Sequence, residues 1–161
     1  MLLTKLKATA GEFFKTGNSK KAAKIYQKLN GYFNFGDVVN NYSKEDEQSE
    51  EYRSTMDELN KLKVTSFTNL VVCKFKMKEY ASVIAISDQI IDMAPNHVKA
   101  LYFRGKSQYM IEEFDEALAT LTKVCELEPA NDDFKKELEH AKRLKQADVK
   151  KQQKVFSKMF K

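Results

Sequence analysis

A pattern that occurs twice, 34 residues apart, constrains the fold of this chain more than any other feature. Three anchors coincide in the two copies, an aromatic residue, a small apolar residue and a proline: Tyr80 and Phe114, Val83 and Ala117, Pro95 and Pro129. Helical periodicity predicts two helices in each copy, at residues 64–77 and 80–93 and at residues 98–110 and 114–127. Because a helix pair cannot bury its apolar face alone, the repeat predicts a stack of helix pairs.

A helix–turn–helix unit of about 34 residues with glycine, aromatic, alanine and proline at set offsets is the tetratricopeptide pattern. The second copy fits it better, with Gly105 and Ala117 where the first has Val71 and Val83. A weaker copy precedes both, marked by a bulky residue, an aromatic, an alanine and a second aromatic: Leu6, Phe13, Ala22 and Tyr26. The coincident anchors argue against the alternative, a helical bundle with chance spacing. We therefore expect an all-α fold of three tetratricopeptide helix pairs, stacked as a right-handed superhelix, with a long C-terminal capping helix.

The repeats occupy residues 1–131, with an insertion at about residues 32–63. Gly31 is expected to end the second helix, followed by a loop with a short turn around Phe35, Val38 and Val39. Ser43 and the acids after it predict the start of one long helix over about residues 44–77. Further helix starts are expected at Asn18 or Ser19, at Asn96 and at Asn131. The basic C-terminal helix is expected over residues 132–161.

Composition restricts the class of protein. The chain is 42% apolar in short runs, which fits neither disorder nor a membrane span. Cys73 and Cys125 fall inside predicted helices with no CxxC motif, so they indicate free thiols of a reducing compartment, and we expect the cytoplasm. Nothing predicts a metal site or another cofactor.

The charge is concentrated in the tail. Residues 134–161 hold ten basic and three acidic residues, a net charge of +7, whereas the rest of the chain has a net charge of −2. Apolar pairs stand among these lysines, at Val155-Phe156 and Met159-Phe160. This composition suits a calmodulin-type partner or an anionic surface, although a solubilising end of a capping helix is the simpler interpretation. Without an Arg-rich or base-stacking module, the tail does not predict nucleic-acid binding.

No catalytic motif is recognisable in the sequence. The histidines, His97 and His140, are interpreted as surface residues, so no catalytic residue is assigned. A groove is predicted instead, because the first helices of stacked pairs line a concave face. Positions 2, 5, 6, 9, 12 and 13 of these helices face it and include Lys7, Gly11, Phe14, Lys15, Thr68, Asn69, Val72, Phe75, Lys76, Lys99, Tyr102, Phe103, Lys106 and Met110. Five lysines without an acid at these positions favour an anionic ligand, the alternative being that they solvate an exposed face.

Three stretches resemble the tetratricopeptide domain of the large immunophilins, FK506-binding-type and cyclophilin-type peptidyl-prolyl isomerases that act as co-chaperones. The stretches are residues 67–80, 96–105 and 155–160, and the resemblance is weakest over residues 32–63. It implies binding of the acidic C-terminus of the ninety-kilodalton heat-shock chaperone. It also implies that an isomerase domain precedes the repeats, so we expect this chain to be a C-terminal fragment without catalytic activity of its own. Calmodulin binding by the tail is implied as well.

The resemblance implies a carboxylate clamp made by Lys7, Gly11, Asn69 and Lys99, with Lys76 as a further cation. Phe103 stands where the family has Arg, and Arg104 follows it. We expect Lys106, one helical turn on, to replace that Arg as a weaker point charge. The alternative function is a tetratricopeptide scaffold for another partner, with a degenerate clamp.

Overall fold

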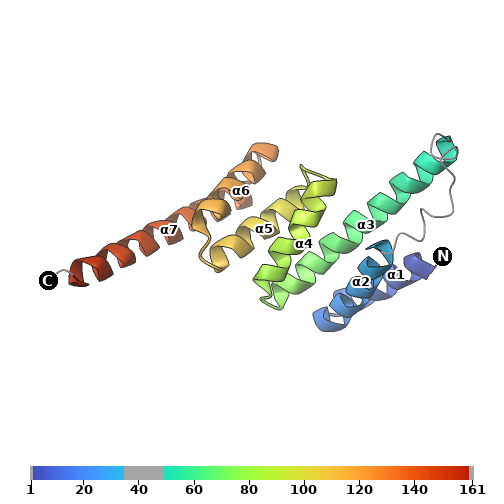
Figure 1. Ribbon diagram of the computed structural model, residues 1–161, viewed down its shortest axis with the longest axis horizontal. Helices are drawn as coiled ribbons and strands as arrows, with labels where there is room; N and C mark the ends of the chain where they lie inside the picture. Colours follow the sequence, from blue (N-terminus) through green and yellow to red (C-terminus); the bar gives the residue numbers. More distant parts are fainter. Residues whose placement is uncertain (1, 35–48, 160–161) are drawn as a thin grey trace. The chain divides into compact units, whose positions relative to one another are not determined.

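The computed structural model describes residues 2–34 and 49–159, and all regular structure in these two stretches is helical. The described residues form seven helices: α1 (Leu2–Lys15), α2 (Ser19–Asn34), α3 (Glu50–Lys76), α4 (Tyr80–Met93), α5 (Val98–Met110), α6 (Phe114–Leu127) and α7 (Asp132–Met159). Figure 1 shows them in chain order. The predicted all-α tetratricopeptide fold is confirmed. The chain forms two compact units, Met1–Glu79 and Tyr80–Lys161, which are described separately. The predicted domain boundary after residue 131 stays a prediction.

In the first unit, α2 packs against both α1 and α3. Its core joins small residues of α1 and α2 to larger side chains of α2 and α3: Ala10, Ala22, Ala23, Tyr26, Leu29, Phe67, Leu70 and Val71. Asn18 caps α2, because the Lys21 N–H donates to its Oδ1 at 3.2 Å. The turn before it contains Gly17 at φ +79°, a left-handed conformation that favours glycine.

Two predicted helix ends in this unit are wrong. α2 continues through Gly31 to Asn34, since a single glycine costs a helix only about 1 kcal/mol. α3 begins at Glu50 rather than near residue 44, because Ser49 is extended and its hydroxyl accepts a hydrogen bond from the Tyr52 N–H at 3.1 Å. Ser43 and the turn expected around Phe35, Val38 and Val39 lie outside the described residues. The predicted helical extension before residue 64 is present in α3.

In the second unit, α4, α5 and α6 have the predicted bounds. Gly105 of α5 allows close approach to α6, because a Cβ at this position would lie 2.8 Å from Leu121 Cγ and 3.0 Å from Leu121 Cδ2. Glu112, at φ 67°, precedes α6 in a left-handed turn, and its counterparts in the first unit are Gly17 before α2 and Lys78, at φ 60°, before α4. Equivalent backbone turns support the repeat more directly than the sequence does.

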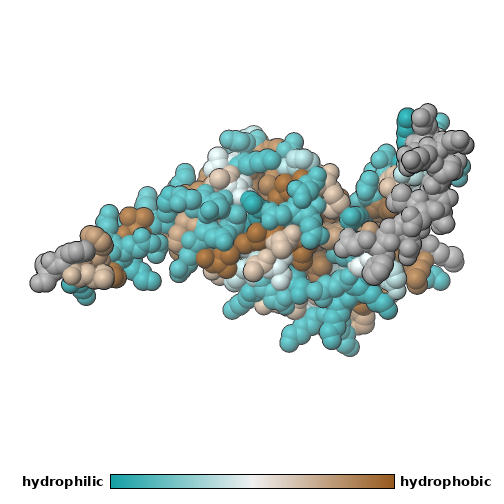
Figure 2. Space-filling view, viewed as in Figure 1, coloured by the Kyte–Doolittle hydropathy of each residue, from teal (hydrophilic) through white to brown (hydrophobic). Residues whose placement is uncertain are grey.

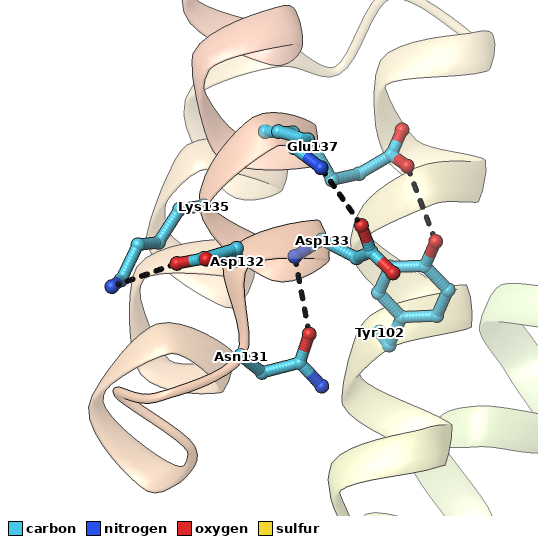
Figure 3. A network of polar contacts seen from close by, with 7 residues as sticks. Tyr102, Asn131, Asp132, Asp133, Lys135 and Glu137 are labelled. Carbon is cyan, nitrogen blue, oxygen red and sulfur yellow. Dashed lines mark hydrogen bonds and ion pairs between the residues drawn. The ribbon is translucent and has the colours of Figure 1, made fainter.

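The predicted capping residue is confirmed for α7 and wrong for α5. Asn131 caps α7 as predicted, with the Asp133 N–H donating to its Oδ1 at 3.1 Å (Figure 3). At α5 the prediction of Asn96 is wrong, because the extended residue is His97, whose Nδ1 accepts from the Ala100 N–H at 3.2 Å. Burial lowers the pKa of His97, which favours the neutral imidazole that this bond requires.

Among the described residues, no helix is both long enough and apolar enough to cross a membrane.

We expect Gly105→Ala to lower the free energy of unfolding by about 1–3 kcal/mol, because the new methyl group would press on the buried Leu121 side chain. Gly31→Ala is the matched control: nothing lies within 4 Å of its added Cβ, and the helix should gain up to about 1 kcal/mol. Denaturant titration followed by circular dichroism measures both. Equal stability of Gly105→Ala and the wild-type protein would contradict this packing.

Candidate functional site

One hollow in the first unit brings together three of the predicted site residues. Lys7 and Gly11 of α1 and Asn69 of α3 line a space of about 440 Å³. α1 supplies most of its lining, and α2 contributes Tyr26. The remaining lining residues all come from α1: Thr4, Ala8, Glu12 and Lys15. Four of the nine groove positions predicted in this unit thus line one space. The other five do not line it: Phe14, Thr68, Val72, Phe75 and Lys76.

A hydrogen bond orients Asn69 within this hollow. Its Nδ2 donates to the Tyr26 hydroxyl at 3.1 Å. Tyr26 is 1% exposed, and burial raises the pKa of its hydroxyl, partly opposed by the bond from Asn69. The side-chain amide is therefore held by a buried residue that cannot move without disturbing the core. A Cβ on Gly11 would come no nearer than 4.0 Å to the Tyr26 hydroxyl, an ordinary contact.

The charges around this hollow are mixed. Lys7 is half-buried and Lys15 exposed, and Glu12 lines the same space. The groove positions predicted from the sequence did not include Glu12. Lys76 is not among the lining residues, and its Nζ lies 4.6 Å from the centre of the Phe14 ring, a cation–π contact.

The other predicted site residues belong to α5 in the second unit. Lys99 is exposed, and it makes no ion pair within residues 2–34 and 49–159. Phe103 is half-buried and packs edge-on against Tyr102, with the ring centres 5.4 Å apart. Arg104 points elsewhere: its Nε donates to Asp88 of α4 at 2.7 Å and its Nη1 to Thr120 of α6 at 2.8 Å. Arg104 therefore joins three helices and is not a substitute for the family Arg.

Lys106 is held by a carboxylate of α7. Its Nζ lies 2.8 Å from Glu137 Oε2 and 3.2 Å from the Tyr102 hydroxyl. Tyr102 donates to the same Glu137 oxygen at 3.1 Å, which Figure 3 shows, and Tyr109 donates to the other. Three donors from one face of α5 thus converge on one carboxylate.

This network changes the interpretation of Lys106. The side chains of Lys106 and Glu137 are 21% and 15% exposed, so the pair is largely shielded from water. Burial alone would raise the pKa of Glu137, but the bonds from Lys106 and Tyr109 lower it below its usual range. Burial would lower the pKa of Lys106, and the bonds to Glu137 and Tyr102 raise it instead. Both groups are charged at neutral pH, and the positive charge of Lys106 has a counter-ion within the chain.

Glu137 was missed by the sequence analysis, although a signal for it existed. Tyr102, Lys106 and Tyr109 are spaced i, i+4 and i+7, so they share one face of α5. Three donors on the face that a capping helix should cover predict an acceptor on that helix. Which acid of α7 fills this role could not be read from the sequence.

The tail of α7 is exposed, with hydrophilic and hydrophobic residues interspersed along it in Figure 2. Val155 is 54%, Phe156 64% and Met159 74% exposed, whereas Phe160 lies outside the described residues. Calmodulin binding by this tail stays a prediction. Within the described part of the chain, no group of three or more His, Cys, Asp or Glu residues could hold a metal ion.

Comparison with known proteins identifies relatives of this chain. It is 24% identical over 148 residues to the peptidyl-prolyl cis-trans isomerase FKBP4 of Mus musculus, a match that covers 92% of the chain. It is 29% identical over 106 residues to FK506-binding protein 59 of Drosophila melanogaster, a match that covers 66% of the chain. The C-terminal TPR-containing domain of a Plasmodium falciparum FK506-binding protein superposes with a TM-score of 0.75, at 24% identity and 91% coverage of both chains.

The chain is homologous to the C-terminal tetratricopeptide region of FKBP4-type immunophilins. The first tetratricopeptide domain of Spaghetti (RPAP3), solved with the HSP90 peptide SRMEEVD, has a TM-score of 0.64, at 20% identity and with 91% and 93% of the two chains covered. No family model matches the chain. The matches span 30% of FKBP4 and 24% of the Drosophila protein. The shared region is the repeat region, which is not the catalytic domain of such isomerases.

We expect Glu137→Gln to lower the free energy of unfolding at pH 7 by about 1–3 kcal/mol, because it leaves the shielded Lys106 ammonium without its counter-ion. The folded-state pKa of Glu137 is depressed, so its contribution is full above its unfolded pKa of about 4.3 and is lost as the pH falls through the lower folded value. Denaturant titrations at pH 7 and below pH 4 should therefore show that the difference in free energy of unfolding between wild type and variant is smaller at the lower pH.

Glu139→Gln is the matched control on α7. Glu139 is 61% exposed and pairs with Lys142 three residues on, so its loss should cost under about 0.5 kcal/mol. A loss of unfolding free energy for Glu137→Gln that is no larger than this, or that does not depend on pH, would contradict the role of Glu137 as the counter-ion of Lys106.

Proposed function

We propose that this chain is a peptide-binding module that captures the acidic C-terminus of a heat-shock chaperone of the ninety-kilodalton class. The observation that carries the proposal is the hollow in which Lys7, Gly11 and the oriented amide of Asn69 meet. An ammonium group and an amide N–H are donors to a carboxylate, and bonds to a charged acceptor are the stronger kind. The glycine leaves room for a peptide backbone between them.

The state of the two polar side chains supports this assignment. The Tyr26 hydroxyl accepts one N–H of the Asn69 amide, and the second N–H is available to a ligand. Lys7 makes no ion pair with the other described residues, so its charge remains available too. Glu12 sits at the same hollow and should disfavour acidic ligand groups placed against it, which restricts where the carboxylate can bind.

Lys99 is the second cation of the proposed clamp. Its assignment rests on its repeat position and on its exposed ammonium, not on a distance to the hollow. The Spaghetti domain, a structural neighbour, was solved with the HSP90 peptide SRMEEVD. That peptide ends in Asp after two glutamates and a valine, so it offers carboxylates to a lysine.

The alternative is a tetratricopeptide scaffold for a different partner. Two observations favour it: Phe103 stands at the family Arg position, and Lys106 is neutralised by Glu137. The clamp of this chain would then have fewer effective cations than the sequence predicted. The requirement for a free terminal carboxylate separates the two functions, because a scaffold groove does not depend on it.

We expect the free-acid peptide SRMEEVD to bind and its C-terminal amide to bind at least tenfold more weakly. Lys7→Ala and Lys99→Ala should each weaken the free acid by roughly tenfold, because a well-made charge-assisted hydrogen bond contributes about 1.5–3 kcal/mol. Calorimetric titration measures the affinities, and circular dichroism checks that the helices persist.

Lys24→Ala is the matched control, since Lys24 is an exposed lysine of α2 that does not line the hollow. The Lys24→Ala variant should bind the free-acid peptide with the same affinity as the wild-type protein. Equal affinity for the acid and the amide would reject the clamp and favour the scaffold.

A further inference from the structure

The last stretch of α7 extends beyond the contacts that hold this helix on its unit. The first half of α7 packs on α5 and α6 through Leu138, Ala141 and Leu144. The residues from Val149 to Met159, called the terminal segment below, are all exposed. An isolated helix of this length is only marginally stable in water, so a surface that binds the terminal segment would also stabilise it.

One face of the terminal segment carries its exposed apolar side chains. Val149, Phe156 and Met159 lie at positions i, i+7 and i+10 of the helix, and Val155 lies beside them. With 3.6 residues per turn, this face continues the one that packs on α5 and α6 earlier in α7. Three of the four apolar residues fall within residues 155–159, so apolar surface is concentrated at the end of the helix.

Two polar side chains separate this apolar end from the docked half of α7. Gln152 lies on the same face, and its Nε2 donates to Asp148 Oδ2 at 2.7 Å. The apolar surface beyond Leu144 is therefore interrupted before it reaches Val155. A partner that needs a continuous apolar face along several turns does not fit this pattern.

The lysines of α7 differ in their surroundings between its two parts. Four ion pairs neutralise lysines of the docked half: Lys135–Asp132, Lys136–Asp133, Lys142–Glu139 and Lys145–Asp115. Four lysines of the terminal segment make no ion pair with other described residues: Lys150, Lys151, Lys154 and Lys158. Helical geometry places these four on the face opposite the apolar side chains. Four clustered cations without counter-ions favour an anionic partner.

We propose that the terminal segment of α7 binds the surface of a lipid bilayer that contains anionic headgroups. The helix would lie in the plane of the interface, with the apolar face inserted and the lysine stems reaching up to the headgroups. Each lysine near such a surface strengthens binding by about fivefold, which corresponds to about 1 kcal/mol. Electrostatic attraction thus supplies most of the affinity, and the short apolar end supplies the rest. A helix that lies on a bilayer in this way need not span it.

Two observations favour a lipid surface over a protein partner. A protein groove that takes up a helix reads apolar anchors at i, i+3, i+4 and i+7, whereas Asp148 and Gln152 interrupt this face. A second copy of the chain would add four more unpaired lysines, and like charges repel. A bilayer requires neither a continuous apolar face nor a fixed pairing of side chains.

Sedimentation of the whole chain with vesicles tests the proposal. Phosphatidylcholine vesicles that contain phosphatidylserine should bind the chain at least about tenfold more tightly than pure phosphatidylcholine vesicles. Added salt should weaken this binding, because it screens the exposed lysines. No binding to the anionic vesicles, or equal binding to both kinds, would overturn the proposal.

Variants with a matched change of net charge locate the contact. Lys150→Gln/Lys151→Gln/Lys154→Gln should bind anionic vesicles at least about tenfold more weakly than wild type. The control, Lys135→Gln/Lys136→Gln/Lys142→Gln, removes three lysines of the docked half and should stay within about twofold of wild type, because these lysines are paired with acids. Equal losses in the two variants would mean that net charge alone attracts the chain, and would overturn the terminal segment as the site.

A second pair of variants tests the apolar insertion. Phe156→Ser/Met159→Ser should weaken vesicle binding by about fivefold or more, because two side chains lose apolar burial. Met93→Ser/Ile111→Ser removes two other exposed apolar residues and should leave binding unchanged. Circular dichroism checks that each variant keeps its helices. Unchanged binding of Phe156→Ser/Met159→Ser would overturn the insertion.

Two other outcomes would assign the terminal segment to a protein partner. Retention on calcium-loaded calmodulin, with no binding to either vesicle, would indicate an acidic protein groove. Self-association that Phe156→Ser/Met159→Ser abolishes, with no vesicle binding, would indicate a second copy of the chain. Either result would overturn the lipid surface as the partner.

Discussion

The burial of α2 between α1 and α3 is the contact on which the candidate site depends. Ala22, Ala23 and Tyr26 of α2 are at most 2% exposed, so α2 holds its two neighbours at a fixed separation. The facing sides of α1 and α3 then form the walls of a groove. Tyr26 belongs to the core and also bonds the Asn69 amide, so the same burial that stabilises the unit orients a donor in the groove.

The second unit uses the corresponding face of α5 differently. α7 covers part of it, and Glu137 receives hydrogen bonds from Tyr102, Lys106 and Tyr109. A carboxylate of the chain itself thus accepts hydrogen bonds from donors that resemble those of a ligand site. The lysines that looked alike in the sequence have different surroundings. Lys106 is paired and Lys76 lies over an aromatic ring, whereas Lys7 and Lys99 make no ion pair with other described residues.

Local patterns predicted the fold because the determinants of a tetratricopeptide are local. Proline and aromatic anchors gave the bounds of α4, α5 and α6, and Asn131 gave the start of α7. The failures occurred where two local signals competed. Gly31 could end a helix or be tolerated in one, Ser43 and Ser49 both precede acids, and His97 follows an equally suitable Asn96.

The site was predictable only in part, because its electrostatics are not local. Repeat positions predicted that Lys7, Gly11 and Asn69 share a face, and these three residues line one hollow. The pairing of Lys106 joins residues 31 apart in sequence, and the bond from Asn69 to Tyr26 joins residues 43 apart. Such contacts join different helices, so the periodicity of a single helix cannot predict them.

The most direct test of the central claim is the nuclear magnetic resonance response of the groove to a peptide. With SRMEEVD as the free acid, the side-chain NH₂ signals of Asn69 and the backbone amide of Gly11 should shift in proportion to occupancy. The C-terminal amide of the same peptide should leave them nearly unchanged. Shifts confined to α7, or equal shifts with acid and amide, would contradict the account of this groove as a receptor for a chain-terminal carboxylate.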